Sequence, residues 1–122
     1  MSFDWSEFLS LAKHLQGLFN IPYSEEAAAR TAVSRAYYAA FCCVRNYAEV
    51  QFDFRRTATG RDHRLLRKHL QNIDSDWLEI AGYLTDLATW RHCCDYDDKV
   101  EGLDKMAPKA IETAKEIIQR RR

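Results

Sequence analysis

The sequence has little glycine and proline, no net charge and no long apolar run. Its 122 residues include only four glycines and two prolines, and 47% are hydrophobic, which excludes a disordered or low-complexity chain. Eighteen basic residues balance eighteen acidic ones, so the chain is not a polycation that coats nucleic acid through its overall charge. No apolar run reaches membrane-spanning length, and the first residues lack the basic-then-apolar pattern of a signal peptide. We therefore expect one cytoplasmic domain, residues 1–122, large enough to bury a core.

Chelating cysteine motifs are also missing. The four cysteines form two adjacent pairs, Cys42-Cys43 and Cys93-Cys94, and neighbours on a helix point about 100° apart. Neither pair is therefore a Cys-x-x-Cys metal motif. One cysteine from each pair together with His92 is the alternative ligand set, but reduced cysteines that act as small core residues explain both pairs more simply. We expect no metal and no cofactor.

Apolar residues follow helical spacing along the whole chain, and no stretch alternates as a strand would. The segment from about Ser24 to Glu49 holds eight alanines and neither glycine nor proline, and its apolar positions recur every 3.6 residues. Further helices are expected at residues 5–19, 62–72, 76–94 and from 98 to the C-terminus. Apparent capping boxes start at Asp4 and Asp76, and Pro108 is expected to kink or divide the last helix. The sequence predicts an all-α, up-and-down bundle of four main helices plus one short helix.

The second predicted helix carries a polar row on a surface otherwise suited to burial. Steps of three and four residues connect its members, which are Thr31, Arg35, Tyr38, Cys42, Arg45 and Glu49. A buried arginine is costly unless it is paired, so Arg35 lies at the helix edge or serves a partner.

The fourth predicted helix supplies candidates for that partner. Its apolar stripe ends at Leu87, the next position on the stripe is Arg91, and Asp95 and Tyr96 follow one turn later. We expect these side chains to meet Arg35 and Tyr38 in one polar pocket. That pocket is either a functional site or a buried ion pair that fixes the register of the two helices.

These two helices resemble the HEPN (higher eukaryotes and prokaryotes nucleotide-binding) domain family. The resemblance rests on Arg35-Ala36-Tyr37-Tyr38-Ala39-Ala40-Phe41 in one helix and on Leu87-Ala88-Thr89-Trp90-Arg91 with Asp95-Tyr96 in the other. It is closest to the small stand-alone prokaryotic members and covers nearly the whole chain. It implies a helical bundle that forms a homodimer across the face that carries these motifs.

The resemblance also implies a function in RNA or nucleotide binding. Many HEPN proteins are metal-independent ribonucleases, often toxins paired with a nucleotidyltransferase antitoxin or effectors of phage defence. Their motif is an arginine followed, after four to six residues, by a histidine that transfers protons while the arginine stabilises the phosphorane. Arg91 matches the arginine, but Tyr96, Asp97 and Asp98 stand where the histidine would fall. The family thus implies at most weak ribonuclease activity, and the alternative is a non-catalytic HEPN module that binds a protein such as a nucleotidyltransferase.

A substitute proton carrier would have to come from elsewhere in the chain. His63, in the run Gly60-Arg61-Asp62-His63, is the favoured candidate, and Tyr96 is the second. Tyrosine is the poorer choice because its usual pKa of about 10 is badly matched to neutral pH.

Charge is unevenly distributed along the chain. Residues 55–69 hold five arginines and one lysine against a single acid, whereas residues 95–104 hold five acids against one lysine. We expect the basic stretch, through Arg55, Arg56 and Arg61, to hold an RNA backbone or a nucleotide phosphate. The alternative is a solvated helix face, or a pair of opposite patches that steer docking.

Overall fold

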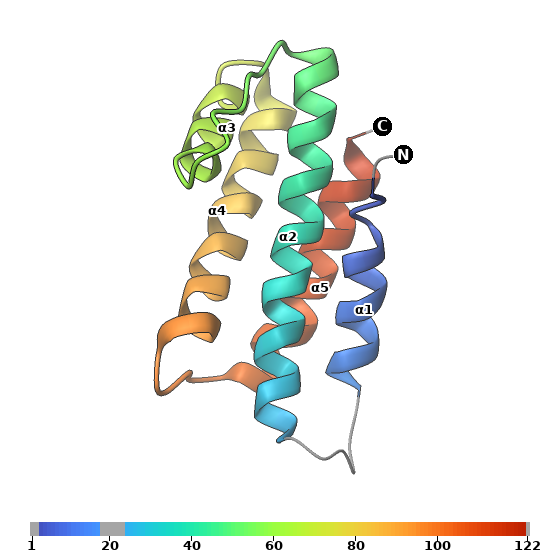
Figure 1. Cartoon of the computed structure of the whole chain (residues 1–122), viewed down its shortest axis with the longest axis vertical. Helices are drawn as coiled ribbons and strands as arrows, with labels where there is room; N and C mark the ends of the chain where they lie inside the picture. Colours follow the sequence, from blue (N-terminus) through green and yellow to red (C-terminus); the bar gives the residue numbers. More distant parts are fainter. Residues whose placement is uncertain (1–2, 18–23, 122) are drawn as a thin grey trace.

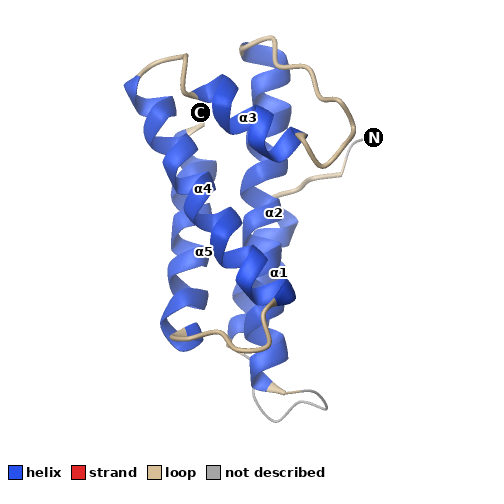
Figure 2. Ribbon diagram, turned by 90° about the vertical axis from the view of Figure 1, so that its left-hand side faces the viewer, coloured by secondary structure: helices blue, strands red, loops and turns tan. Residues whose placement is uncertain are grey.

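The computed structural model describes residues 3–17 and 24–121, which form five helices and no strand. The helices are α1 (Glu7–Gln16), α2 (Glu25–Gln51), α3 (Asp62–Leu70), α4 (Ser75–Tyr96) and α5 (Leu103–Arg120). The four long helices run alternately down and up the long axis, and α3 lies at the end where α2 stops and α4 begins (Figures 1 and 2). The predicted all-α bundle of four main helices plus one short helix is confirmed.

The central element is α2, which packs against α1, α4 and α5. Val33, Ala36, Ala40 and Val44 are fully buried, as the 3.6-residue period predicts. The alanines let the neighbouring helices approach α2 closely. Ser24 caps the helix, since its hydroxyl accepts the Ala27 N–H at 3.0 Å.

The remaining helices contribute one stripe each to the same core. On α4 the predicted stripe is buried, and Leu66 and Leu70 of α3 are also fully buried. The α5 contribution consists of three alanines and three isoleucines: Ala107, Ala110, Ile111, Ala114, Ile117 and Ile118. On α1 the buried residues are Leu9 and Ala12, while Trp5 and Phe8 are only partly covered. The last member of the predicted α1 stripe, Phe19, lies outside the described residues.

Neither of the two predicted capping boxes forms. The N-cap of α4 is Asp74, whose carboxylate accepts the Trp77 N–H at 2.9 Å, so the predicted capping box at Asp76 does not form. Asp74 competes successfully because it lies three residues before Trp77, the spacing that the cap hydrogen bond requires. Before α1, the Asp4 carboxylate accepts both the N–H and the O–H of Ser6, and the helix itself begins at Glu7.

The start of α5 is also later than predicted, at Leu103 instead of residue 98. The carbonyl groups of Asp97 and Asp98 accept hydrogen bonds from the Arg30 side chain of α2 and so are not part of a helical ladder. Gly102 then takes a left-handed conformation, with φ at +68°, that favours glycine. Pro108 lies inside α5 and does not divide it.

The cysteines belong to the packing of the bundle. All four are free thiols, and Cys42, Cys43 and Cys94 are buried. Within residues 3–17 and 24–121, no group of three or more His, Cys, Asp or Glu side chains is placed to hold a metal ion. No helix in the described part of the chain is long and apolar enough to cross a membrane.

The cap of α4 gives a direct test of this boundary. We expect Asp74→Ala to lower the free energy of unfolding by about 1 kcal/mol, because the Trp77 N–H loses its acceptor. The matched change Asp76→Ala removes an exposed carboxylate 3.7 Å from Arg120 and should cost less than about 0.5 kcal/mol. Urea unfolding followed by circular dichroism measures both, and equal losses in the two variants would contradict the assignment of the cap.

Candidate functional site

A stack of arginine and tyrosine side chains joins α2 to α4. The guanidinium of Arg35 lies 5.0 Å from the centre of the Tyr38 ring, and that of Arg91 lies 5.6 Å from the same centre. Arg35 also covers the ring of Phe8 from α1 at 4.8 Å, and Arg91 covers Tyr37 at 5.5 Å. Cation–π contacts of this kind stabilise a partly desolvated guanidinium by about 0.5–2 kcal/mol each.

Asp95 connects the two arginines through hydrogen bonds. Its Oδ2 atom lies 3.4 Å from Arg91 Nη1 and accepts the Ser34 hydroxyl at 3.4 Å. Arg35 Nη2 in turn donates to Ser34 Oγ at 3.3 Å. The structure therefore brings Arg35, Tyr38, Arg91 and Asp95 together as expected, but Arg35 reaches Asp95 only through Ser34. The role of Ser34 could not be predicted, because a serine on an alanine-rich helix is an ordinary small residue.

Tyr96 does not join this cluster. Its side chain is 67% exposed, and its ring packs against His92 with 4.9 Å between ring centres. It stands one residue beyond Asp95 on the helix, so it points about 100° away from that carboxylate. As a proton carrier for the Arg91 region, Tyr96 is thus badly placed.

A cleft of about 670 Å³ lies beside the stack. It is bounded by the start of α1, by one face of α2 and by the segment from residue 56 to 63. Its lining consists of aromatic, cationic and small side chains: Trp5, Phe8, Arg35, Tyr38, Phe41, Cys42, Arg45, Arg56, Ala58, Thr59, Gly60, Asp62 and His63.

The polar row predicted on α2 forms the floor of this cleft. Arg35, Tyr38, Cys42 and Arg45 all line it. The two ends of the row, Thr31 and Glu49, do not line it. The Thr31 hydroxyl donates to the carbonyl group of Ala27 within the helix. The helical spacing of the row therefore predicted which face of α2 borders the cleft.

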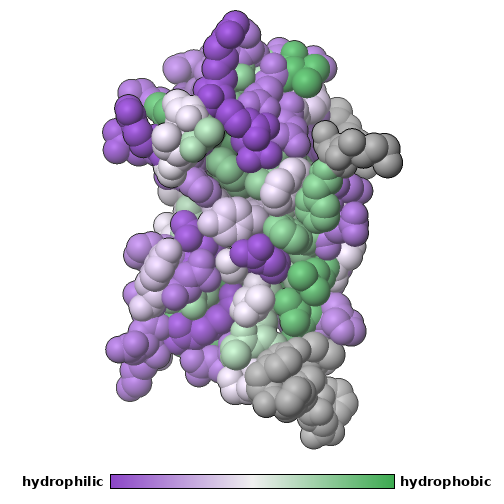
Figure 3. Space-filling view, viewed as in Figure 1, coloured by the Kyte–Doolittle hydropathy of each residue, from purple (hydrophilic) through white to green (hydrophobic). Residues whose placement is uncertain are grey.

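The aromatic walls were not predicted as part of a site. Phe8 belongs to α1 and Trp5 lies just before that helix, and their rings contact each other edge to face with 5.5 Å between centres. In Figure 3 apolar side chains gather over α1, while polar ones cover α3 and α4. The sequence signal for these residues was helical spacing alone, which is equally typical of core positions.

Arg35 and Arg45 have no carboxylate oxygen within 4.0 Å among the described residues. Arg45 instead lies 5.6 Å from the ring of Trp5 and 5.9 Å from that of Phe41. Arg56, the third arginine of the cleft, lies 2.6 Å from the Glu49 carboxylate, which neutralises its charge. The hydrogen bond from Arg56 in turn lowers the pKa of Glu49. Arg35 and Arg45 therefore lie on aromatic rings without a carboxylate that cancels their charge, although Arg45 Nε and Nη2 donate to Asn46 Oδ1 at 3.1 and 3.0 Å.

His63 lies at the junction of the cleft and the stack. Its ring stacks on Phe41 with 4.3 Å between centres, and its Nδ1 atom is hydrogen-bonded to the Tyr37 hydroxyl. Burial lowers the pKa of His63, and the positive charges of Arg91 and Arg67 lower it further. The expected candidate proton carrier is therefore part of the site and is neutral at pH 7.

Asp62 shapes the loop that closes the cleft. Its carboxylate accepts the N–H and O–H of Thr57 at 2.8 and 2.7 Å and the N–H of Ala58 at 2.9 Å. These donors, led by the Thr57 hydroxyl, hold the pKa of Asp62 below its usual value. Ala58 takes a left-handed conformation with φ at +60°, which these bonds maintain. The sequence showed Asp62 only as a helix start.

The basic stretch predicted from residues 55–69 is divided among different surfaces. Only Arg56 of the three proposed binding arginines lines the cleft. Arg55 is 86% exposed and lies 3.6 Å from Asp53, and Arg61 borders a separate shallow hollow with Arg64. A run of charges in sequence does not make one patch here, because Arg55, Arg56 and Arg61 precede α3 and the later basic residues lie on that helix.

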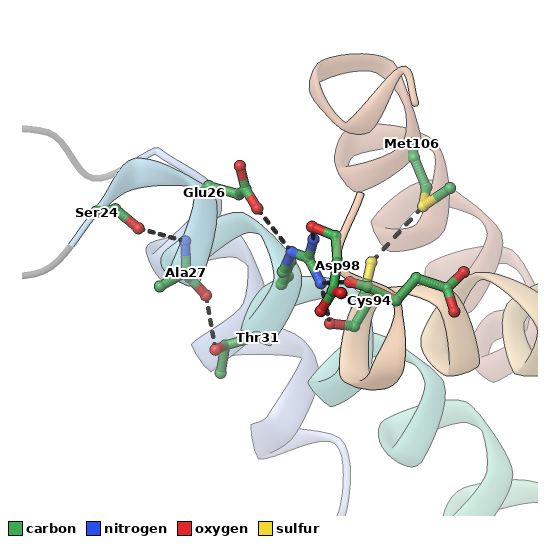
Figure 4. A network of polar contacts seen from close by, with 9 residues as sticks. Ser24, Glu26, Ala27, Thr31, Cys94, Asp98 and Met106 are labelled. Atoms are coloured by element: carbon green, nitrogen blue, oxygen red, sulfur yellow. Dashed lines mark hydrogen bonds and ion pairs between the residues drawn. The ribbon is translucent and has the colours of Figure 1, made fainter. Parts of the chain in front are cut away.

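Arg30 of α2 is a further functional-looking residue whose role is structural. Its guanidinium donates to the carbonyl groups of Cys94, Asp97 and Asp98 at the end of α4, and its Nε atom bonds Glu26 at 2.9 Å. Figure 4 shows Glu26, Cys94 and Asp98 around this contact. A cation at the C-terminus of a helix satisfies its last carbonyl groups and its dipole. Arg30 therefore fixes the end of α4, which carries Asp95.

No family model, no curated protein and no solved structure matches this chain. The geometry of the cleft is therefore the observation from which a function can be argued.

Proposed function

We propose that this chain is a HEPN-like RNA- or nucleotide-binding protein whose cleft holds one unpaired nucleotide. The observation that carries the proposal is the pair of guanidinium groups, Arg35 and Arg45, that face the cleft without a carboxylate partner among the described residues. Both stack on aromatic rings that line the same cleft.

The chemistry of the cleft matches the two parts of a nucleotide. A guanidinium that no carboxylate neutralises attracts phosphate oxygens, and the Nη1 groups of Arg35 and Arg45 make no hydrogen bond to any described residue. Exposed aromatic faces bind bases, at about 1–3 kcal/mol for each stacked base, with little preference for sequence. A cleft of about 670 Å³ has the size of a small-ligand site. It admits a single nucleotide or the end of a single strand, and a duplex does not fit.

Binding is tested with a labelled single-stranded RNA of ten nucleotides, followed by fluorescence anisotropy, with adenosine monophosphate as competitor. We expect Arg35→Ala and Arg45→Ala each to weaken binding about tenfold to hundredfold, because each removes charged hydrogen bonds worth about 1.5–3 kcal/mol to a phosphate. Adenosine without its phosphate should compete poorly.

Arg55→Ala is the matched control, since it removes the same charge from an exposed position outside the cleft. It should change the affinity less than twofold at 150 mM salt. If Arg55→Ala weakens binding as much as Arg45→Ala, the RNA lies on the loop surface and the cleft is not the site.

Weak metal-independent ribonuclease activity is the second proposed function. It is favoured by the placement of His63 and Arg91, because both contact the ring of Tyr37, at 5.6 and 5.5 Å. A protonated His63 would donate its Nε2 proton to the leaving 5′-oxygen while solvent takes the proton of the attacking 2′-hydroxyl, and Arg91 would stabilise the phosphorane. These two residues would replace the arginine–histidine pair of the HEPN motif, whose histidine the chain lacks.

Cleavage of a labelled RNA, resolved on a gel, tests this activity. We expect it to be slow, to survive EDTA, and to fall in Arg91→Ala by about a hundredfold to a thousandfold. His63→Ala should abolish it as well. RNA that stays intact with the wild-type protein, together with a lowered melting temperature in Arg91→Ala from the stranded Asp95, would favour the non-catalytic module that binds a partner such as a nucleotidyltransferase.

We further propose a homodimer that buries the Arg91–Tyr96 end of α4 near a two-fold axis, in a toxin–antitoxin or phage-defence system. The exposed ring of Tyr96 suits such a contact. Light scattering at about 100 µM should give a dimer, and Tyr96→Glu should dissociate it. Leu78→Glu, at an exposed position near the other end of α4, should leave the dimer intact. A wild-type monomer at that concentration would refute the dimer.

A further inference from the structure

The hydroxyl of Tyr37 is the buried polar group closest to the cleft that neither proposed function uses. Tyr37 is fully buried on α2, and the one partner of its hydroxyl among the described residues is His63 Nδ1. Burial raises the pKa of Tyr37 well above its usual value, so the hydroxyl keeps its proton.

This contact determines where His63 carries its own proton. A buried O–H group needs an acceptor, and Nδ1 serves as one only when it bears no hydrogen. If Nδ1 donated instead, the Tyr37 O–H would be left without an acceptor. The neutral ring must therefore carry its hydrogen on Nε2.

Nε2 is the free end of the ring. It makes no hydrogen bond to any residue that the structure describes, and it is not among the buried polar atoms left without a partner. His63 itself lines the cleft with Arg35 and Arg45. An N–H group on Nε2 is thus placed to donate to an anion in that cleft.

We propose that Tyr37 is a positioning residue, which fixes the tautomer of His63 so that the Nε2–H group donates to a phosphate held by Arg35 and Arg45. The inference rests on the proposed nucleotide binding and adds a third donor to it. Stacking on Phe41 fixes the plane of the imidazole. The hydrogen bond to the Tyr37 hydroxyl fixes the direction in which Nδ1 points within that plane.

The charges around His63 keep this donor neutral. Arg91 of α4, Arg67 of α3 and Arg45 of α2 lower its pKa, after the larger effect of burial, and Asp62 raises it. The faces of Tyr37 and Tyr38 complete its surroundings. As pH falls below the pKa of His63, the second ring nitrogen is protonated. Both nitrogens then carry a hydrogen, and the choice of tautomer no longer matters.

The experiment compares Tyr37→Phe with the wild type, using Tyr83→Phe as a matched control because that hydroxyl bonds Glu79 at 3.1 Å, outside the cleft. Long-range ¹H–¹⁵N spectra of the histidine rings, without ligand at pH 7.5, report the tautomer. We expect His63 to carry its hydrogen on Nε2 in the wild type and in Tyr83→Phe, and to become a mixture of tautomers in Tyr37→Phe.

The affinity for the ten-nucleotide RNA gives the second readout. Tyr37→Phe should weaken binding about threefold to tenfold at pH 7.5, and the loss should shrink toward pH 5. His63→Ala should weaken binding at least as much, and adding Tyr37→Phe to it should cost nothing more. His63→Gln, whose amide N–H reaches the position of Nε2, should recover part of the affinity.

Two outcomes separate this inference from the proposed function. RNA binding by the wild type that Tyr37→Phe leaves unchanged, or an Nδ1–H tautomer in the wild type, would overturn the role of Tyr37 while nucleotide binding stands. A fixed Nε2–H tautomer with no RNA binding by the wild type would overturn the proposed function, and the phosphate contact of His63 with it. A loss in Tyr37→Phe that is the same at every pH would show a packing role only.

Discussion

The burial of α2 against three other helices is the constraint on which the rest of this structure depends. A helix covered on most sides has little room for charge, yet α2 carries Arg30, Arg35 and Arg45 along its length. Each of these guanidinium groups must be compensated where it leaves the core. Arg30 binds carbonyl groups at the end of α4, whereas Arg35 and Arg45 lie on aromatic rings. The compensation differs, and so does what each residue can do.

Stacking on aromatic rings leaves an arginine able to bind, whereas an ion pair does not. A ring face stabilises the guanidinium through its quadrupole but leaves the N–H edge free for an acceptor. Arg56 shows the contrast, because Glu49 occupies its N–H groups and cancels its charge. The aromatic residues of α1 and α2 therefore have two tasks. They cover part of the core, and they stabilise two guanidinium groups that no carboxylate neutralises.

Much of the fold could be predicted from the sequence because it depends on periodicity. Five helices, the buried stripe of α2 and the placement of Arg91 at the end of the α4 stripe all follow from spacing. The errors lie at helix ends, where one hydrogen bond decides the boundary. Asp74, and not Asp76, caps α4 by accepting the Trp77 N–H. The carbonyl group of Asp98 accepts a hydrogen bond from Arg30, 68 positions earlier in the chain.

The candidate site was only half predictable, for a related reason. Arg35, Tyr38, Arg91 and Asp95 share two helices whose facing stripes are visible in sequence. The cleft, however, depends on how α1 and the 56–63 loop sit over α2. That arrangement depends on tertiary contacts, such as the hold of Asp62 on Thr57, which no spacing rule reveals. The three arginines expected to bind from the basic run at residues 55–69 lie on different surfaces, because they belong to a loop whose path the sequence does not reveal.

The same contacts make the proposed binding compatible with a net charge of zero. Affinity depends on charge and also on how much conformational freedom is lost on binding. Groups on packed helices have little such freedom before binding, so they lose little. Arg35, Tyr38 and Arg45 stand on a helix that three neighbours immobilise, and His63 is held by a ring stack and a hydrogen bond. The one loop wall of the cleft is tied by the Asp62 carboxylate to the start of α3. The acidic residues that balance the total charge are concentrated at residues 95–104, and within that stretch only Asp95 makes an ion pair with the stack, through Arg91. A locally positive, preorganised cleft is thus compatible with a neutral chain, because packing, and not composition, decides which charges meet.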